Sequence, residues 1–348
     1  MIDFIDCTID KVSVHTVGNK TNEEELRLSK SLLDTSDMDV KELLLNFFLK
    51  PFKIPEFYSF TFSNKDFKLN PLYIFASQIF DDIESFHPNS VNMAKHLYEL
   101  SVHPMIKSGD LFIAYFSDMS FEDESVDVIG IFKSENRQDF LKLNCSNNDF
   151  SIHHEDGINI EKLDKGCLIL NTKRDSGYKV CIIDKSNKSG EAQFWKDNFL
   201  QLKAFKDDYH HTKEFMNITK NFVTKQLTDE YEVSKADQIA LLNRSVDYFK
   251  THESFEKTDF EEQVFNDTEV IKSFQNFDEQ YREDHDIYLN DSFEVSSQAV
   301  KKQSRIFKSV LKLDKNFHIY IHGNKEMIEQ GVENDGRKFY KIYFEKEA

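Results

Sequence analysis

Two aspartates and a lysine come nearest to a hydrolytic pattern in this chain. Asp110 and Asp127 lie at or near the starts of two neighbouring strand-like segments, GDLFIAYFSD and SVDVIGIFKSE, and Lys133 lies in the second. Paired carboxylates with a lysine beside a sheet can hold a divalent metal for phosphodiester cleavage. However, the second segment has Phe132-Lys133-Ser134 where a Glu-x-Lys motif would be needed, and acids are common among 348 residues with 62 Asp and Glu. A divalent-metal nuclease is therefore a hypothesis that the pattern does not favour.

Other catalytic and metal-binding motifs are absent from the sequence. There is no G-x-x-x-x-G-K-[ST], G-x-G-x-x-G, G-x-S-x-G or H-E-x-x-H. The adjacent pairs His153-His154 and His210-His211 point in different directions on a strand or a helix. His318 and His322 would share a strand face about 13 Å apart, too far for one metal ion. We therefore expect no catalytic residue, no metal site and no cofactor.

The cysteines and the composition indicate a reducing compartment. No C-x-x-C pair occurs among the four cysteines, Cys7, Cys145, Cys167 and Cys181. We expect them to be buried, reduced thiols.

The N-terminus MIDFIDCTIDKV has no basic region followed by an apolar run, so we expect no secretory signal. No apolar stretch approaches the roughly 18 residues of a membrane span, so no membrane partner is expected.

A local cluster of positive charge contrasts with the net charge of −18. Between residues 301 and 315 there are six basic side chains and one acid, Asp314. Such a patch on an acidic protein is a candidate contact surface, because most of the remaining surface would repel a polyanion. Any contact with nucleic acid must therefore be local, or be made by an oligomer that juxtaposes these patches. The basic residues are Lys301, Lys302, Arg305, Lys308, Lys312 and Lys315.

Hydrophobic periodicity predicts an α+β protein in two domains, 1–200 and 201–348. The first domain mixes strands and helices, with a helix from Ser36 as N-cap to Pro51, helices over 72–83 and 91–105, and strand pairs at 109–135 and 167–184. In segment 109–118 apolar residues occupy both parities, which predicts a strand buried on both faces. The second domain is predicted helical, with Ser234 as an N-cap, and ends in a small antiparallel β-meander. Residues 253–294 hold fourteen acids and three bases, which predicts a solvated helical face.

The C-terminal segment can be assigned a strand register. If Asp314-Lys315-Asn316 is the turn, Leu313 lies opposite Phe317 and Leu311 opposite Ile319. One face is then apolar, and the other carries the pairs Lys312–His318, Val310–Tyr320 and Lys308–His322. Lysine with aromatic side chains suits phosphate contact and base stacking. An ordinary half-exposed strand face would show the same residues, so both interpretations stay open.

The same segment resembles a known family. KSVLKLDKNFHIYIHGN followed by IEQGVENDGRKFYKIYF is similar to the C-terminal end of the bacterial nucleoid-associated proteins (NdpA-like). The similarity is strongest over residues 305–345 and is collinear elsewhere, including SGDLFIAYF, FKDDYHHTKEFMNITKNF and SKADQIALLNRSVDYFKTHE. The resemblance implies a bacterial cytoplasmic protein of the nucleoid that binds DNA and has no known enzymatic activity. It supplies no catalytic residue.

Two functions from different classes follow. The first is a non-enzymatic nucleoid-associated protein that binds double- or single-stranded DNA with low sequence specificity and associates with itself as a homodimer. The second is an acidic protein-interaction module that binds a basic partner or mimics DNA, with indirect nucleoid association. For the first, the expected DNA-binding residues are Lys301, Lys302, Arg305, Lys308, Lys312, His318 and Tyr320.

Overall fold

The computed structural model divides the chain into two compact units, Met1–Phe205 and Lys206–Ala348. The sequence-based boundary after residue 200 falls just before the last strand of the first unit, β11 (Leu202–Ala204). The structure describes all residues except 1, 5, 53–55, 64–65, 123, 147–148, 186–192, 306, 308–309, 314–316, 321–327, 345 and 347–348, and at 2–3, 310–312, 318, 320 and 330 it describes the backbone alone.

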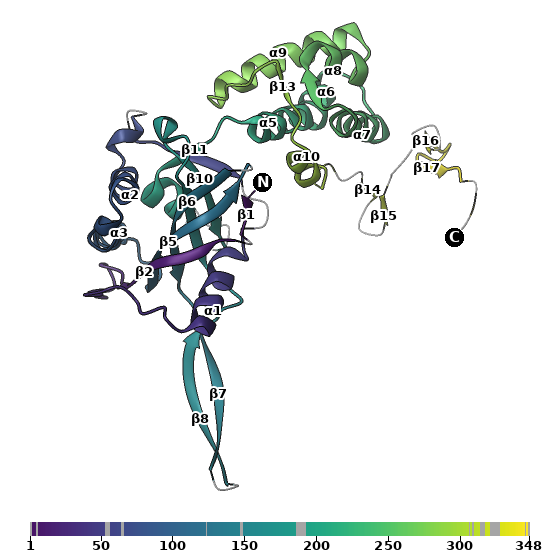
Figure 1. The fold of residues 1–348 in the computed structure, drawn as a ribbon. Helices are drawn as coiled ribbons and strands as arrows, with labels where there is room; N and C mark the ends of the chain where they lie inside the picture. The colour runs from purple at the N-terminus through teal and green to yellow at the C-terminus, as the bar shows by residue number, and fades with distance from the viewer. Residues whose placement is uncertain are drawn as a thin grey trace. The chain divides into compact units, whose positions relative to one another are not determined.

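The first unit is built on a nine-stranded antiparallel sheet (Figure 1). Its strand order is β11-β4-β10-β9-β6-β5-β2-β3, and β1 pairs with β5 as well. The two strand pairs predicted from the sequence, β5–β6 and β9–β10, lie next to each other at its centre. The strands are β1 (Ile2–Asp3), β2 (Thr8–Val17), β3 (Leu26–Leu28), β4 (Phe57–Phe60), β5 (Gly109–Phe121), β6 (Glu124–Ser134), β9 (Lys165–Leu170), β10 (Lys179–Asp184) and β11.

The sheet is buried on both faces, as the pattern in β5 predicts. Leu111, Ile113 and Tyr115 join a core with helices α2 (Pro71–Asp81) and α3 (Phe86–Leu100) and the helical turns of η4 (Phe194–Leu200). Phe112, Ala114 and Phe116 join a second core with α1 (Met38–Leu49). Because successive strand residues point to opposite faces, a strand between two helical layers must be apolar at both parities.

Two helix starts differ from the sequence prediction. Asp37, and not Ser36, caps α1, because its carboxylate accepts hydrogen bonds from the backbone N–H groups of Asp39 and Val40. Helix α3 begins at Phe86, before the expected start at 91, and contains Pro88 in its first turn. Proline is tolerated there because the first N–H groups of a helix have no intrahelical acceptor. Three short 3₁₀ turns, η1 (Phe67–Leu69), η2 (Ile83–Ser85) and η3 (Arg174–Ser176), complete the first unit.

A long two-stranded ribbon extends from this unit (Figure 1). It consists of β7 (Arg137–Ser146) and β8 (Asp149–Ile158), which pair antiparallel along their whole length and form a sheet of their own. Neither strand is among the predicted elements. Their side chains are exposed almost throughout, and the last two residues of β8 alone are partly covered.

The second unit is helical and has a phenylalanine-rich core. Phe215, Phe222, Phe255, Phe260 and Phe274 are fully buried. The predicted Ser234 cap is confirmed, since its hydroxyl accepts the Asp237 N–H over 3.1 Å. The elements are α5 (Asp208–Asn221), η5 (Phe222–Gln226), α6 (Leu227–Glu230), α7 (Lys235–Thr251), β12 (Ser254–Glu256), α8 (Lys257–Val264), α9 (Thr268–Asp284), β13 (Ser292–Glu294) and α10 (Ser297–Gln303).

The acidic stretch 253–294 is not a purely solvated face. Glu261 and Asp278 are buried. Asp278 contacts two bases, with 2.6 Å to Lys257 Nζ and 2.7 Å to Arg282 Nε. Two acids of the stretch therefore belong to the interior, because the helices turn them inward toward the bases and amides of the same segment.

Four short strands are described near the end of the chain, where the sequence predicts an antiparallel β-meander, and the described strands do not join into one sheet. They form two separate antiparallel hairpins, β14 (Val310–Leu313) with β15 (Phe317–Tyr320) and β16 (Ile328–Val332) with β17 (Lys338–Ile342). Leu313, Ile319, Ile328 and Tyr340 pack against Ile239 of α7. An Asn334-Asp335-Gly336 turn joins β16 to β17, with Gly336 at φ 84°. Among the described helices of the whole chain, none is long and apolar enough to cross a membrane.

Candidate functional site

Helix α10 carries the first three predicted DNA-binding residues. Ser296 caps the helix by accepting the Ala299 N–H over 3.3 Å. The helix buries its apolar side, including Val300, and exposes Lys301 and Lys302, and Arg305 is exposed just beyond its end. The three cations therefore reach solvent from one short segment, because the other side of α10 packs into the core of the unit.

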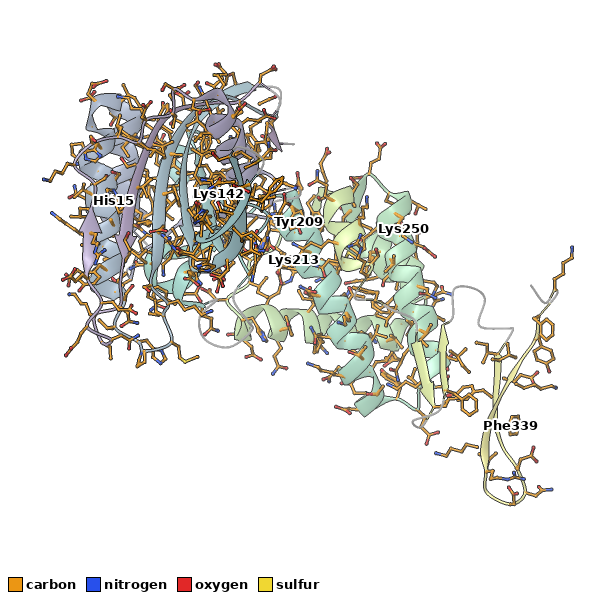
Figure 2. The ribbon with its side chains drawn as sticks, turned by 90° about the horizontal axis from the view of Figure 1, so that it is seen from below. His15, Lys142, Tyr209, Lys213, Lys250 and Phe339 are labelled. Carbon is orange, nitrogen blue, oxygen red and sulfur yellow. The ribbon has the colours of Figure 1, made fainter. Side chains whose placement is uncertain are left out.

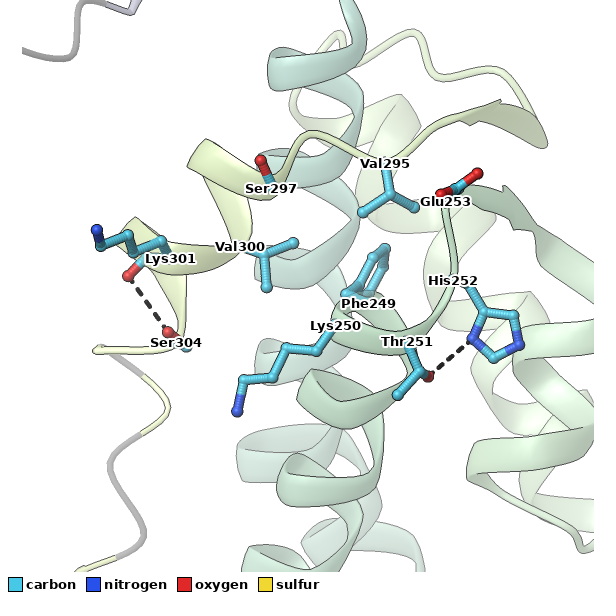
Figure 3. Close-up of a pocket in the computed structure, with 10 residues that line it drawn as sticks. All are labelled: Phe249, Lys250, Thr251, His252, Glu253, Val295, Ser297, Val300, Lys301 and Ser304. Atoms are coloured by element: carbon cyan, nitrogen blue, oxygen red, sulfur yellow. Dashed lines mark hydrogen bonds between the residues drawn. The ribbon is translucent and has the colours of Figure 1, made fainter.

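A pocket of about 510 Å³ lies beside these cations (Figure 3). The end of α7 and one side of α10 form it, and the Val295 N–H, which donates to the Glu253 carbonyl over 2.7 Å, joins the two segments. Phe249, Val295 and Val300 supply its apolar side chains, while Lys250 and Lys301 supply positive charge. Figure 2 shows Lys250, which belongs to α7, among the helices of the second unit. The full lining is Phe249, Lys250, Thr251, His252, Glu253, Val295, Ser297, Val300, Lys301 and Ser304.

Lys302 also lies near an aromatic ring. Its Nζ is 5.8 Å from the centre of the Tyr209 ring, within the range of cation–π attraction. A pocket whose lining combines apolar side chains, the Phe249 ring and lysines can hold a flat ring and contact an adjacent anion. The lysines were predictable from the sequence, whereas the pocket was not, because its walls come from segments some fifty residues apart in the chain.

The remaining predicted residues lie in or near the β14–β15 hairpin. Its register is as predicted, with Lys312 opposite His318 and Val310 opposite Tyr320. The structure describes the backbone of Lys312, His318 and Tyr320 without their side chains, and Lys308 lies outside the described residues. Their DNA contacts therefore stay a prediction.

The nuclease candidates are not brought together. Asp110 pairs with Ser134 at one end of the β5–β6 ladder, whereas Asp127 precedes Val128, the partner of Phe116 near the other end. Asp110 contacts Arg137 over 2.9 Å and accepts a hydrogen bond from Thr16 over 3.1 Å. At about 3.4 Å per residue, the two carboxylates are too far apart to share a metal ion. Within the described part of the chain, no three His, Cys, Asp or Glu side chains are arranged to hold one.

Lys133 belongs instead to a buried ion cluster. Its Nζ lies 3.0 Å from Glu135 Oε1, and Lys165 Nζ lies 3.0 Å from the same carboxylate. Asp164 accepts the backbone N–H of Glu135 over 2.7 Å. Burial lowers the pKa of Lys133, and the Glu135 charge opposes that shift. The cluster is enclosed, so it serves packing and offers no open position for a substrate.

The cysteine prediction is correct for three residues and wrong for the fourth. Cys7, Cys167 and Cys181 are buried free thiols, and burial raises the pKa of Cys7 to about 12. Cys145 is exposed on β7. The ribbon that carries it had a sequence signal, since Leu141, Leu143 and Cys145 alternate with polar residues before a turn.

Comparison with known proteins agrees with the resemblance found in the sequence. A family model described as nucleoid-associated protein YejK matches residues 13–337 of the chain. The match spans both units and includes α10 and the β14–β15 hairpin. No curated protein matches the chain.

Proposed function

We propose, because this chain belongs to the family of the nucleoid-associated protein YejK, that it binds DNA in the bacterial nucleoid through the surface around α10. The protein acts without catalysis in the cytoplasm, has low sequence specificity and associates with itself. The observation that supports this proposal most directly is the exposure of Lys301, Lys302 and Arg305 on one segment. Cations presented together can replace the counterions of neighbouring phosphates.

The pocket beside α10 suggests which form of DNA binds better. A duplex keeps its bases stacked, whereas a single strand can place a base in a recess lined by Phe249 and Val300 while Lys301 contacts a phosphate. The net charge of −18 repels the rest of a long duplex. We therefore expect single-stranded DNA to bind at least as tightly as duplex DNA of equal length.

Binding to fluorescent single-stranded and duplex oligonucleotides across a salt series tests the proposal. We expect micromolar or tighter binding that weakens steeply with salt. Replacing Lys301, Lys302 and Arg305 together by Ala should weaken binding and reduce the salt slope by about 0.7 per lost phosphate contact on a single strand and about 0.9 on a duplex. An unchanged affinity and slope in this variant would refute the site.

A matched control separates local contact from net charge. Lys68, Lys162 and Lys203 are exposed lysines of the first unit, and replacing them by Ala changes the net charge by the same amount. This control should bind DNA nearly as the parent does. Equal weakening in both triple variants would indicate a general charge effect and no site at α10.

A second function stays open because of the charge on α9. Glu269, Glu279, Glu283 and Asp284 are exposed there, and Lys272 of the same helix pairs with Glu269 at 3.4 Å. Such a surface suits a basic protein partner or DNA mimicry. A partner that stays bound in a pull-down from nuclease-treated lysate, together with no DNA binding at low salt, would favour this interaction module.

A further inference from the structure

The β7–β8 ribbon has one apolar face and one polar face. Residues directly opposite each other share a face of an antiparallel pair, so Leu143 lies beside Ile152 and Leu141 beside His154, with Cys145 beside Phe150. The other face carries pairs such as Asn144 with Ser151 and Lys142 with His153. The ribbon is therefore amphipathic along the half nearer its tip.

The apolar face is open to solvent in the described chain. The exposed fractions are 71% for Leu141, 60% for Leu143, 68% for Phe150 and 64% for Ile152. A two-stranded ribbon is at best marginally stable in water without a partner for one face. A contiguous apolar patch of this kind marks a contact surface.

The charge of the ribbon argues against DNA as the partner. It carries the acids Asp139, Asp149, Glu155 and Asp156, while Arg137 and Lys142 are its basic residues apart from two histidines. Arg137 is held by Asp110 and Asp156, at 2.9 and 3.1 Å. A phosphate backbone would meet more acids than bases here.

The charge of the whole chain indicates what kind of partner can approach. Two copies with a net charge of −18 repel each other over most of their surfaces. From Leu141 to Cys145 and from Phe150 to His154, the apolar face has no acid and no lysine or arginine. It is a surface where a second copy can dock without like-charge contact.

We propose that the protein dimerises by packing the apolar faces of two β7–β8 ribbons against each other about a two-fold axis near the Leu143–Ile152 pair. Such a contact is isologous, because both copies use the same surface, and its central pair, Leu143 and Ile152, is apolar in each copy. This inference names the surface for the self-association in the proposed function. The dimer contact belongs to the first unit, whereas the proposed DNA-binding residues of α10 belong to the second.

The size of the face predicts a weak dimer. At roughly 200 Å² per large apolar residue, the four exposed side chains offer about 500 Å² in each copy, or about 1,000 Å² in a pair. That area is near the lower limit for a specific interface. We therefore expect a monomer–dimer equilibrium in the micromolar range.

Sedimentation equilibrium of the full chain, free of nucleic acid, from about 1 to 100 μM tests the proposal. The variant Leu143→Lys/Ile152→Lys should raise the dimer dissociation constant at least tenfold, which is about 1.4 kcal/mol. The control Asn144→Lys/Ser151→Lys places two lysines opposite each other on the polar face of the same ribbon, so it has the same added charge and should dimerise as the parent does. Circular dichroism checks that both variants are folded.

The exposed thiol provides an independent readout. Cys145 lies on the apolar face, so a short bis-maleimide should link two copies of the parent and of the polar-face control, and it should not link Cys145→Ser. A parent that is monomeric at 100 μM, or equal dimerisation of both lysine variants, overturns the proposal. A monomeric parent whose Cys145 resists maleimide would show that the chain covers this face itself, which also overturns it. DNA binding is measured separately, so either proposal can fail alone.

Discussion

Glu135 lies 3.0 Å from the amines of two buried lysines, Lys133 and Lys165, and only 1% of the Lys133 side chain is exposed. Lys133 lies in the last residues of β6 and Glu135 directly after them, where the chain leaves the sheet toward the β7–β8 ribbon. Removing one partner of a buried ion pair leaves the other charge uncompensated in a medium of low polarity. The cluster therefore ties the base of the ribbon to the sheet.

Glu135→Gln should destabilise the first unit strongly. It removes the carboxylate charge that both Lys133 and Lys165 contact, and breaking a buried pair in this way costs about 3–5 kcal/mol. Urea unfolding followed by tryptophan fluorescence measures the change, because the single tryptophan, Trp195, is buried in this unit. The control is Glu161→Gln, which breaks the exposed pair with Lys50 and should leave the midpoint unchanged. Equal effects of the two variants would contradict the assignment.

His15 makes the stability of the first unit depend on pH. His15 lies on β2 (Figure 2) and contacts α3, since its Nε2 is 3.1 Å from Ser90 Oγ, and its Nδ1 accepts the Ser29 N–H over 3.1 Å. Burial, aided by nearby His87, lowers the pKa of His15 from 6.5 to about 4. The unfolded state thus binds the proton more readily between these values, and stability is lost as the pH falls from about 6.5 toward 4.

For His15 alone, this difference amounts to about 2 kcal/mol between pH 7 and pH 5. Replacement by Gln removes the titration, so the stability of His15→Gln should fall less over that interval than the parent's. Urea unfolding at the two pH values measures the difference. If parent and variant lose the same stability, His15 does not titrate as described.

Structural features that depend on residues close together in the chain were predictable from the sequence. The two parities of residues 111–116 gave a strand buried on both faces, and Ser234 with Asp237 marked the start of α7. The cap of α1 is Asp37 and not Ser36. Both residue types are good caps, so the sequence alone does not show which of two neighbours is the cap. Helix α3 started early because a proline is acceptable in a first turn.

The pairing of strands that are far apart in the chain could not be predicted from local sequence patterns. The short strands β4 and β11 join the sheet by pairing Ser59 with Lys203, and no local pattern relates residues so far apart. The lysines of α10 were identified from composition, whereas the pocket beside them depends on the packing of Val300 near Phe249. The β7–β8 ribbon carried a visible alternation, so it was predictable in principle.

Glu261 is a buried acid that reduces the stability of the second unit. Its Oε2 accepts a hydrogen bond from Gln275 over 2.6 Å, and its buried Oε1 has no hydrogen-bond partner. Burial raises the pKa of Glu261, so its contribution to stability falls as the pH rises above the ordinary value of 4.5. Glu261→Gln should therefore stabilise the protein at pH 7 by about 0.5–2 kcal/mol.

Thermal unfolding of Glu261→Gln at pH 7 and near pH 4.5 measures this effect. The gain should shrink at the lower pH, because the raised pKa of Glu261 lets more of the parent's carboxyl be protonated there. Glu262→Gln, at the exposed neighbouring position on α8, is the control and should change stability by less than about 0.5 kcal/mol. A gain that is equal at both pH values would point to a cause other than the buried charge.

Ile239 fixes the C-terminal hairpins to α7. Leu313 and Ile319 of the first hairpin and Ile328 and Tyr340 of the second pack against it. Each hairpin has two strands and could not persist alone in water. Figure 2 shows Phe339 among the side chains of the second hairpin, and a Cβ at Gly331 would clash with its ring.

Ile239→Ala should release both hairpins while the helical core persists, because it removes the shared apolar contact at a cost of about 2–4 kcal/mol. Limited proteolysis with mass spectrometry should then show faster cleavage after about residue 305 and unchanged cleavage elsewhere. Leu241→Ala, two residues along the same helix but in the phenylalanine-rich core, is the control and should lower the stability of the whole unit. If Ile239→Ala also weakens DNA binding, the hairpin residues around Lys312 and His318 contribute to the interface. If binding is unchanged, the cations of α10 are sufficient.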